Sequence, residues 1–208
     1  MLSKLIPLGL ENQEVKVNFV IRHGIGVATL VEKLKDLMES AGADFRRTKI
    51  AACYHDAGKL LWPEELFHKP NKLLGRKDWE TIYSHPENGA SMLEQTCLPD
   101  CSGQTGLPTT VRQAGDGAFC SGNPSVVDLV FLHHEKPDGS GYYRVKDLPV
   151  EVGFLSICDV FDACMNDRLY RKAMPKNVAV QTAVSPWESF LGKEITGEIM
   201  ERFKKCKE

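Results

Sequence analysis

The sequence predicts an all-α protein that folds as a single helical domain. Apolar residues recur at intervals of three and four in several segments, which is the spacing of a buried helix face. No segment alternates apolar and polar residues as a half-exposed strand does. At 208 residues the chain is long enough to bury a substantial core. The predicted organisation is one domain over residues 1–208, with a core at about 15–175, a glycine- and cysteine-rich loop insertion at about 96–123, and C-terminal helices at 176–208.

The first two predicted helices place polar groups near the core. Residues 15–40 carry apolar side chains at helical spacing, and His23 falls on that apolar stripe. Asp44 is a predicted N-cap for a second helix, which runs to the adjacent pair His55 and Asp56. Both groups are therefore expected to point into the bundle.

His85 is predicted to lie at a junction between two helices. Pro86 disfavours the helical conformation for the residue before it and suits the first turn of the helix that follows. A side chain at such a junction can be aimed inward. Later helices carry the pair His133 and His134 and the acid Asp159. After residue 60 the predicted helices span residues 77–84, 87–95, 124–134, 150–166, 177–184 and 194–204.

Residues 96–123 interrupt the helical pattern. They hold five glycines, two prolines and three cysteines, and they show no helical periodicity. Loops this long inside a compact domain are usually functional. We expect a surface segment at the mouth of the functional site that controls access or selectivity. The alternative is a loop far from the site that has neither role.

Composition and charge argue against several classes of partner. The formal net charge is −2 and the isoelectric point is about 6.3, so there is no general basic field for a DNA or RNA duplex or for an anionic membrane. No apolar run approaches the ~20 residues of a membrane span, and residues 1–10 do not form a secretory signal. Seven cysteines is an odd number, which favours free thiols over a disulfide framework. We expect the chain in the cytoplasm.

Five of the six histidines fall in four short clusters, which predicts a metal centre. Imidazole and carboxylate together suit iron, manganese or zinc, and two such groups of ligands suit two metals side by side. A carboxylate such as Asp56 can bridge two cations that activate a water for attack on a phosphate. Lys59 could steady that phosphate as a point charge. The clusters contain His23, His55, Asp56, His85, His133 and His134, and the acids Asp159 and Asp162 follow downstream.

These clusters resemble the motifs of the HD superfamily of metal-dependent phosphohydrolases, and within it the HD-GYP family. Residues 55–59 match HDxGK, residues 85–89 match HPxxG, and residues 133–142 match HHExxDGxGY. Residues 159–163 and 167–171 match DxxDA and DRxYR. The resemblance implies a helical bundle of the HD-domain type that hydrolyses cyclic di-GMP with a metal-activated water.

The resemblance also implies roles for individual residues. Asp56 and Lys59 would act in catalysis. The cofactor would be two divalent transition metals, iron or manganese first, with zinc, nickel or magnesium as alternatives. The partners would be cyclic di-GMP or a related nucleotide, and a signalling protein. The implied metal ligands are His23, His55, Asp56, His85, His133, His134 and Asp159, and the implied substrate-binding residues are Lys59, Tyr142, Arg168 and Arg171.

Three departures from the family pattern leave alternatives open. The GYP signature reads GYY at residues 141–143, Phe19 stands where some members carry a glutamate that adds a third metal, and the segment before His133 is longer than usual. The alternatives are a phosphohydrolase that acts on another nucleotide, a catalytically weak domain that binds a nucleotide or a partner protein, and a di-iron sensor that binds oxygen.

Overall fold

The computed structural model describes residues 14–96, 124–167 and 172–206. Within these ranges every regular element is a helix and none is a strand, which confirms the predicted all-α fold. The insertion lies outside the described residues from position 97 onward, and so do Arg168 and Arg171. Among the described helices, none has both the length and the apolar composition to cross a membrane. The single-domain organisation stays a prediction.

Fourteen helical elements, three of them short 3₁₀ turns named η, make up the described chain. The N-terminal part contains α1 (Glu14–Lys33), α2 (Lys35–Ser40), α3 (Phe45–Tyr54), η2 (Ala57–Leu61), α4 (Glu64–His68), η3 (Asn71–Leu73), α5 (Arg76–Tyr83) and α6 (His85–Glu94). The C-terminal part contains α7 (Val126–Leu132), α8 (Val150–Met165), α9 (Lys176–Val184), η5 (Ser185–Trp187), α10 (Glu188–Leu191) and α11 (Lys193–Lys205).

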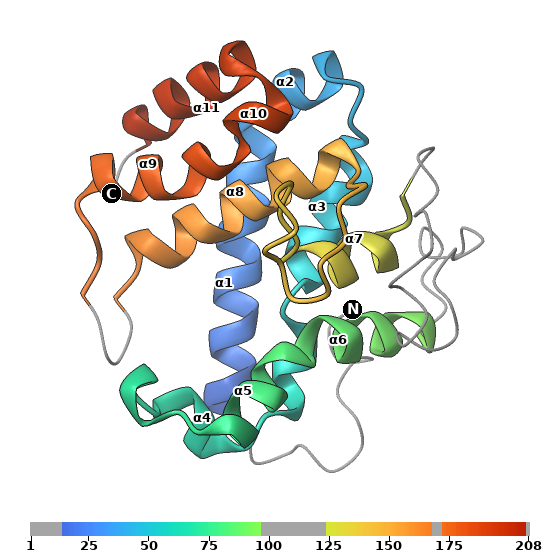
Figure 1. Cartoon of the computed structure of the whole chain (residues 1–208), viewed down its shortest axis with the longest axis vertical. Helices are drawn as coiled ribbons and strands as arrows, with labels where there is room; N and C mark the ends of the chain where they lie inside the picture. The colour runs from blue at the N-terminus through green and yellow to red at the C-terminus, as the bar shows by residue number, and fades with distance from the viewer. Residues whose placement is uncertain (1–13, 97–123, 168–171, 207–208) are drawn as a thin grey trace.

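Helix α1 runs through the middle of the bundle, and helices from both parts of the chain pack along it (Figure 1). α3 and α8 contact it directly, α7 packs on α3 and α6, and α9 packs on α8 and α11. Full burial of one large apolar side chain contributes roughly 1.5–3 kcal/mol, so this shared core stabilises the arrangement. Its largest fully buried side chains include Trp187, Phe131, Phe154, Phe203, Leu34 and Met38.

The predicted helix at residues 15–40 is in fact two helices. α1 ends at Lys33 and α2 begins at Lys35. The helix is interrupted at Leu34 because its amide donates to the carbonyl of Val31, three residues earlier rather than four, at 3.0 Å. Leu34 is itself fully buried, so the apolar stripe continues across the break. Periodicity alone therefore could not reveal it.

Local side-chain hydrogen bonds account for two helix starts. Asp44 caps α3 as predicted, since its carboxylate accepts from the Arg47 amide at 3.0 Å. Ser125 caps α7 and forms a reciprocal capping box with Asp128. α6 begins at His85, two residues before its predicted start, so His85 occupies the junction that the sequence indicates.

Two glycines let the backbones that carry the histidine clusters touch. η2 and α6 pack together at Gly58 and Gly89. A Cβ atom on Gly58 would overlap the His85 carbonyl oxygen and lie 2.7 Å from the Gly89 amide nitrogen. Only glycine allows the two backbones to come this close. The close contact sets the distance between His85 and the turn that follows His55 and Asp56.

Candidate metal centre

The seven residues predicted as metal ligands converge in the interior of the bundle. They come from α1, from the turns after α3 and α7, from the start of α6, and from α8. They form three overlapping groups, and within each group one ligand atom per residue lies within 4.8 Å of the others. All are buried except His134, which is partly buried. The groups are Asp56, His85, His133 and His134; His23, His55 and Asp56; and His55, His133 and Asp159.

Free carbonyl groups at helix ends aim three of these histidines. His55 directly follows α3, and its Nδ1 bonds the Ala52 carbonyl, three residues earlier, at 2.9 Å. His85 and His133 repeat this bond to the carbonyl three residues earlier, each at 2.6 Å. The last carbonyls of a helix lack helical partners, so each imidazole satisfies one of them and turns its Nε2 inward. The Nε2 atoms of His85 and His133 meet at 3.3 Å.

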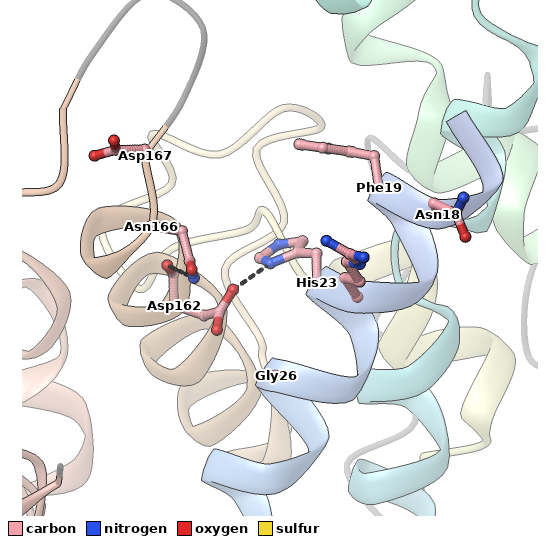
Figure 2. Close-up of a pocket in the computed structure, with 8 residues that line it drawn as sticks. Asn18, Phe19, His23, Gly26, Asp162, Asn166 and Asp167 are labelled. Carbon is pink, nitrogen blue, oxygen red and sulfur yellow. Dashed lines mark hydrogen bonds and ion pairs between the residues drawn. The ribbon is translucent and has the colours of Figure 1, made fainter. Parts of the chain in front are cut away.

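Two carboxylates from α8 aim His23, which lies in the interior of α1. Its Nδ1 lies 2.6 Å from Asp162 Oδ2, and its Nε2 lies 2.8 Å from Asp159 Oδ1. Figure 2 shows the first contact bridging α1 and α8. Burial opposes a charge on this ring, but its hydrogen bonds to the two carboxylates raise the pKa of His23 to about 9. Two carboxylates from one helix therefore contact the two ring nitrogens of His23.

Asp56 lies in the middle of the cluster. Its Oδ1 is 3.4 Å from His85 Nε2 and 3.6 Å from His55 Nε2, and its Oδ2 is 2.6 Å from Lys59 Nζ. Burial alone would raise the pKa of Asp56, but the charge of Lys59 and the neighbouring histidines hold it well below its usual range. Asp56 is thus a buried anion that faces lysine on one side and imidazole nitrogens on the other.

The donor atoms of this cluster fit a metal. His55 Nε2 and Asp56 Oδ1 are buried and have no hydrogen-bond partner, and unpaired buried polar atoms call for a ligand or ion. Burial lowers the pKa of His85 and His133, and lowers that of His134 to about 3, so these rings are neutral and keep an electron pair for coordination. Neutral imidazoles around a carboxylate anion are a donor set that divalent transition metals take.

A row of aromatic rings leads from the surface to the cluster. Tyr142 packs on His134 with ring centroids 4.5 Å apart, and Tyr83 meets Tyr142 edge-on at 4.6 Å. Trp79 continues the row from Tyr83 at 5.7 Å, and both of these α5 residues are exposed. Flat rings of this kind are surfaces on which aromatic ligands stack.

Glu135 and Tyr143 fix the loop that carries Tyr142. The fully buried Glu135 carboxylate accepts two backbone amides of this loop, each at 2.8 Å. Tyr143 stands at the proline position of the GYP signature; its hydroxyl donates to the Tyr83 carbonyl at 2.8 Å, and its ring stacks on Phe131 at 4.5 Å. The loop is therefore tied to α5 and α7 although the proline is absent.

Three residues that shape this cluster had no role assigned to them from the sequence. Asp162 bonds His23, Trp62 lies with its ring 5.4 Å from the Lys59 ammonium, and Tyr83 borders the aromatic row. Asp162 had a signal, because it belongs to the DxxDA stretch. Trp62 and Tyr83 had none, since no motif includes them and only folding brings them to the cluster.

Comparison with known proteins places the chain in a family. The family model described as HD domain matches residues 20–164. A cyclic di-GMP phosphodiesterase of Pseudomonas aeruginosa is 26% identical over 191 residues, which cover 90% of this chain and 40% of that protein. A 3′3′-cGAMP-specific phosphodiesterase of Vibrio cholerae is 29% identical over 148 residues, which cover 70% of this chain and 24% of that protein. The chain thus spans less than half the length of these relatives.

A solved structure has the same fold. The HD domain of the phosphodiesterase PgpH of L. monocytogenes, solved in complex with cyclic-di-AMP, aligns with a TM-score of 0.59 at 16% identity, over 93% of this chain and 92% of that chain. The family match at residues 20–164 includes all seven converging side chains. This chain belongs to the HD-domain family, as its HD-GYP-type motifs predicted.

Proposed function

We propose that this chain is a metal-dependent phosphodiesterase that hydrolyses a cyclic dinucleotide. One observation carries the proposal: seven histidine and aspartate side chains from separate parts of the bundle converge, and two of their buried atoms, His55 Nε2 and Asp56 Oδ1, have no hydrogen-bond partner. The names of relatives that share the domain, a cyclic di-GMP phosphodiesterase and a cGAMP-specific one, support the reaction class. Cyclic di-GMP is our first candidate for the substrate.

We propose two divalent transition metals per chain, iron or manganese first. Phe19, at the position of the glutamate that adds a third metal in some family members, packs edge-on against Phe67 at 5.7 Å and offers no ligand. Bound metals would supply Lewis acidity that lowers the pKa of a water and neutralises phosphate charge. The residues that would hold them are His23, His55, Asp56, His85, His133, His134 and Asp159.

Lys59 is the proposed cation for the substrate phosphate. Its ammonium lies 2.6 Å from Asp56 Oδ2 and 5.4 Å from the centre of the Trp62 ring. These two contacts hold the ammonium in one position. The side chain is 15% exposed, which leaves it reachable from solvent. A fixed cation beside the reacting phosphate stabilises the negative charge that develops during attack.

We propose that the aromatic row of Trp79, Tyr83 and Tyr142 binds a nucleobase. A base stacked against Tyr83 and Tyr142 would hold its phosphodiester beside His134, which Tyr142 contacts. Stacking contributes roughly 1–3 kcal/mol per base and tolerates any base, so this row does not distinguish guanine from adenine. Arg168 and Arg171 stay proposed phosphate contacts outside the described residues, and the cytoplasm and a signalling partner stay expectations from the sequence.

The test is turnover measured together with metal content. Protein from metal-replete cells should contain about two iron or manganese ions per chain and should cleave cyclic di-GMP. Cyclic di-AMP and 3′3′-cGAMP, assayed in parallel, rank the substrates, and protein stripped by a chelator serves as the matched control. Less than one metal per chain, or cleavage of none of the three dinucleotides, would refute the proposal. Tight binding without cleavage would favour the catalytically weak binding domain instead.

A further inference from the structure

His23 is held differently from the other histidines of the cluster. His55, His85 and His133 each bond a carbonyl near a helix end, where such groups lack helical partners. His23 lies in the interior of α1, where helical bonds already use the carbonyls. Its Nδ1 instead meets a side chain from another helix, Asp162 of α8, at 2.6 Å.

We propose that Asp162 is the positioning residue of the metal centre: it fixes the ring of His23 and thereby selects Nε2 as the metal-binding atom. This inference rests on the proposed function, since it concerns the same centre. A carboxylate that accepts a hydrogen bond from Nδ1–H leaves the electron pair of the neutral ring on Nε2. That nitrogen faces the cluster, 2.8 Å from Asp159 Oδ1 and 3.7 Å from Asp56 Oδ2.

The surroundings of Asp162 hold its carboxylate in place. Gly26 lies one turn beyond His23 on α1, and a Cβ atom there would overlap Asp162 Oδ1 and lie 3.0 Å from its Cγ. The absence of a side chain at Gly26 is what lets the carboxylate approach α1. Asp162 also borders a cleft of about 620 Å³ between α1 and α8, in which Figure 2 shows Gly26, His23 and Asp162 side by side. Although it borders the cleft, the Asp162 side chain is only 15% exposed.

Without this acceptor, His23 would lose the group that sets its orientation. The imidazole could turn about its Cβ–Cγ bond or carry its proton on Nε2, and either change removes the electron pair from the cluster. Partners that orient a metal-binding histidine typically contribute 10- to 100-fold to metal affinity, so we expect a loss of about that size when Asp162 is removed.

The experiment measures metal affinity in the full chain, with no substrate present. Stripped wild-type protein, Asp162→Ala and Asp162→Asn are titrated with Mn²⁺ in a calorimeter. Asp162→Ala should bind one Mn²⁺ about 10- to 100-fold more weakly. Asp162→Asn keeps an oxygen acceptor and loses the charge, so its affinity should lie nearer the wild type than that of Asp162→Ala. Equal losses in the two variants would mean that Asp162 acts through its charge, and the proposal would be wrong.

Two further variants test whether the position of the Asp162 carboxylate matters, or whether any change in this cleft lowers the affinity. Gly26→Ala retains Asp162 but displaces its carboxylate, and it should lower Mn²⁺ affinity in the same direction. Asp167→Asn removes a negative charge that borders the same cleft and should leave the affinity unchanged. The thermal unfolding of each metal-free variant shows whether it is folded. An Asp167→Asn loss as large as that of Asp162→Ala would overturn the proposal.

A spectroscopic measurement tests the tautomer directly. In protein with ¹⁵N-labelled histidine and bound Zn²⁺, His23 should show a protonated Nδ1, and Asp162→Ala should lose that signal. A wild-type ring with its proton on Nε2 would refute the inference. If the wild type binds neither Mn²⁺ nor Zn²⁺, the proposed metal centre itself fails. If it binds them and Asp162→Ala binds them equally well, only the role of Asp162 fails.

Discussion

Alanine at Gly58 should weaken the fold and the metal centre together. A Cβ atom at this position would overlap the His85 carbonyl oxygen and approach the Gly89 amide nitrogen to 2.7 Å, whereas real Cβ contacts stay beyond 3.0 Å. Both obstacles are backbone atoms of α6, which cannot rotate away as a side chain can. Relief therefore requires η2 and α6 to separate, and that movement carries His85 away from Asp56.

The size of both effects follows from this geometry. Forcing an extra carbon into a well-packed contact typically costs about 1–3 kcal/mol, which in a chain of this length lowers Tm by roughly 2–12 °C. Metal–ligand distances tolerate changes of only about 0.2 Å, and the contact at Gly89 must open from 2.7 Å to beyond 3.0 Å. We therefore expect metal affinity to fall about 10- to 100-fold as well.

Calorimetry of the stripped protein gives Tm, and Mn²⁺ titration gives the affinity. Gly197→Ala is the matched control: Gly197 lies exposed inside α11, and a Cβ atom there has no neighbour within 4 Å. Because alanine is the better helix former, this control should gain about 0.5–1 kcal/mol and raise Tm by roughly 1–4 °C. If Gly58→Ala retains the wild-type Tm and affinity, the close packing of η2 and α6 is not what positions His85.

Three further predictions concern turnover and access. Asp56→Ala should abolish hydrolysis of the cyclic dinucleotide while circular dichroism still shows a folded helical protein; wild-type turnover would exclude the two-metal mechanism. Tyr83→Ala should raise KM by roughly 5- to 150-fold with metal content unchanged, because it removes one stacking face; an unaltered KM would place the base elsewhere. Replacing residues 96–123 with a short Gly/Ser linker should leave metal content and Tm nearly unchanged but alter substrate affinity or range, and unfolding would mean that the segment is structural.

The helices of about two turns or more could be predicted. α3, α8 and α11 follow the helical spacing of their apolar residues, and a local cap such as Asp44 marks where α3 begins. The short helices α4 and α10, of five and four residues, were not predicted because they contain barely one turn, too little for a period to show. The break at Leu34 was hidden for the opposite reason, since a buried leucine continues the stripe on either side of it.

The candidate metal centre was predictable as a set of residues but not as an arrangement. Compact motifs such as the pair His55 and Asp56 mark which side chains belong together. The aromatic row was not predictable, because Tyr83 and Tyr142 lie on segments that only the packing of α5 against the later loop brings together. Glu135 illustrates the same limit: the motif at residues 133–142 includes it, but only the folded structure shows that its carboxylate accepts backbone amides of the loop that carries Tyr142.

The placement of the motifs explains why short sequence signatures can encode this centre. A helix end leaves carbonyl groups without partners, and a buried imidazole needs an acceptor for one nitrogen before the other can face inward. A histidine three residues after a carbonyl of the last helical turn meets both needs with one bond, as His55, His85 and His133 do. Because this hydrogen bond joins residues only three positions apart, a short sequence motif is enough to encode it. His23, inside a helix, requires an acceptor from another part of the chain, and for that reason no local pattern around His23 indicated Asp162.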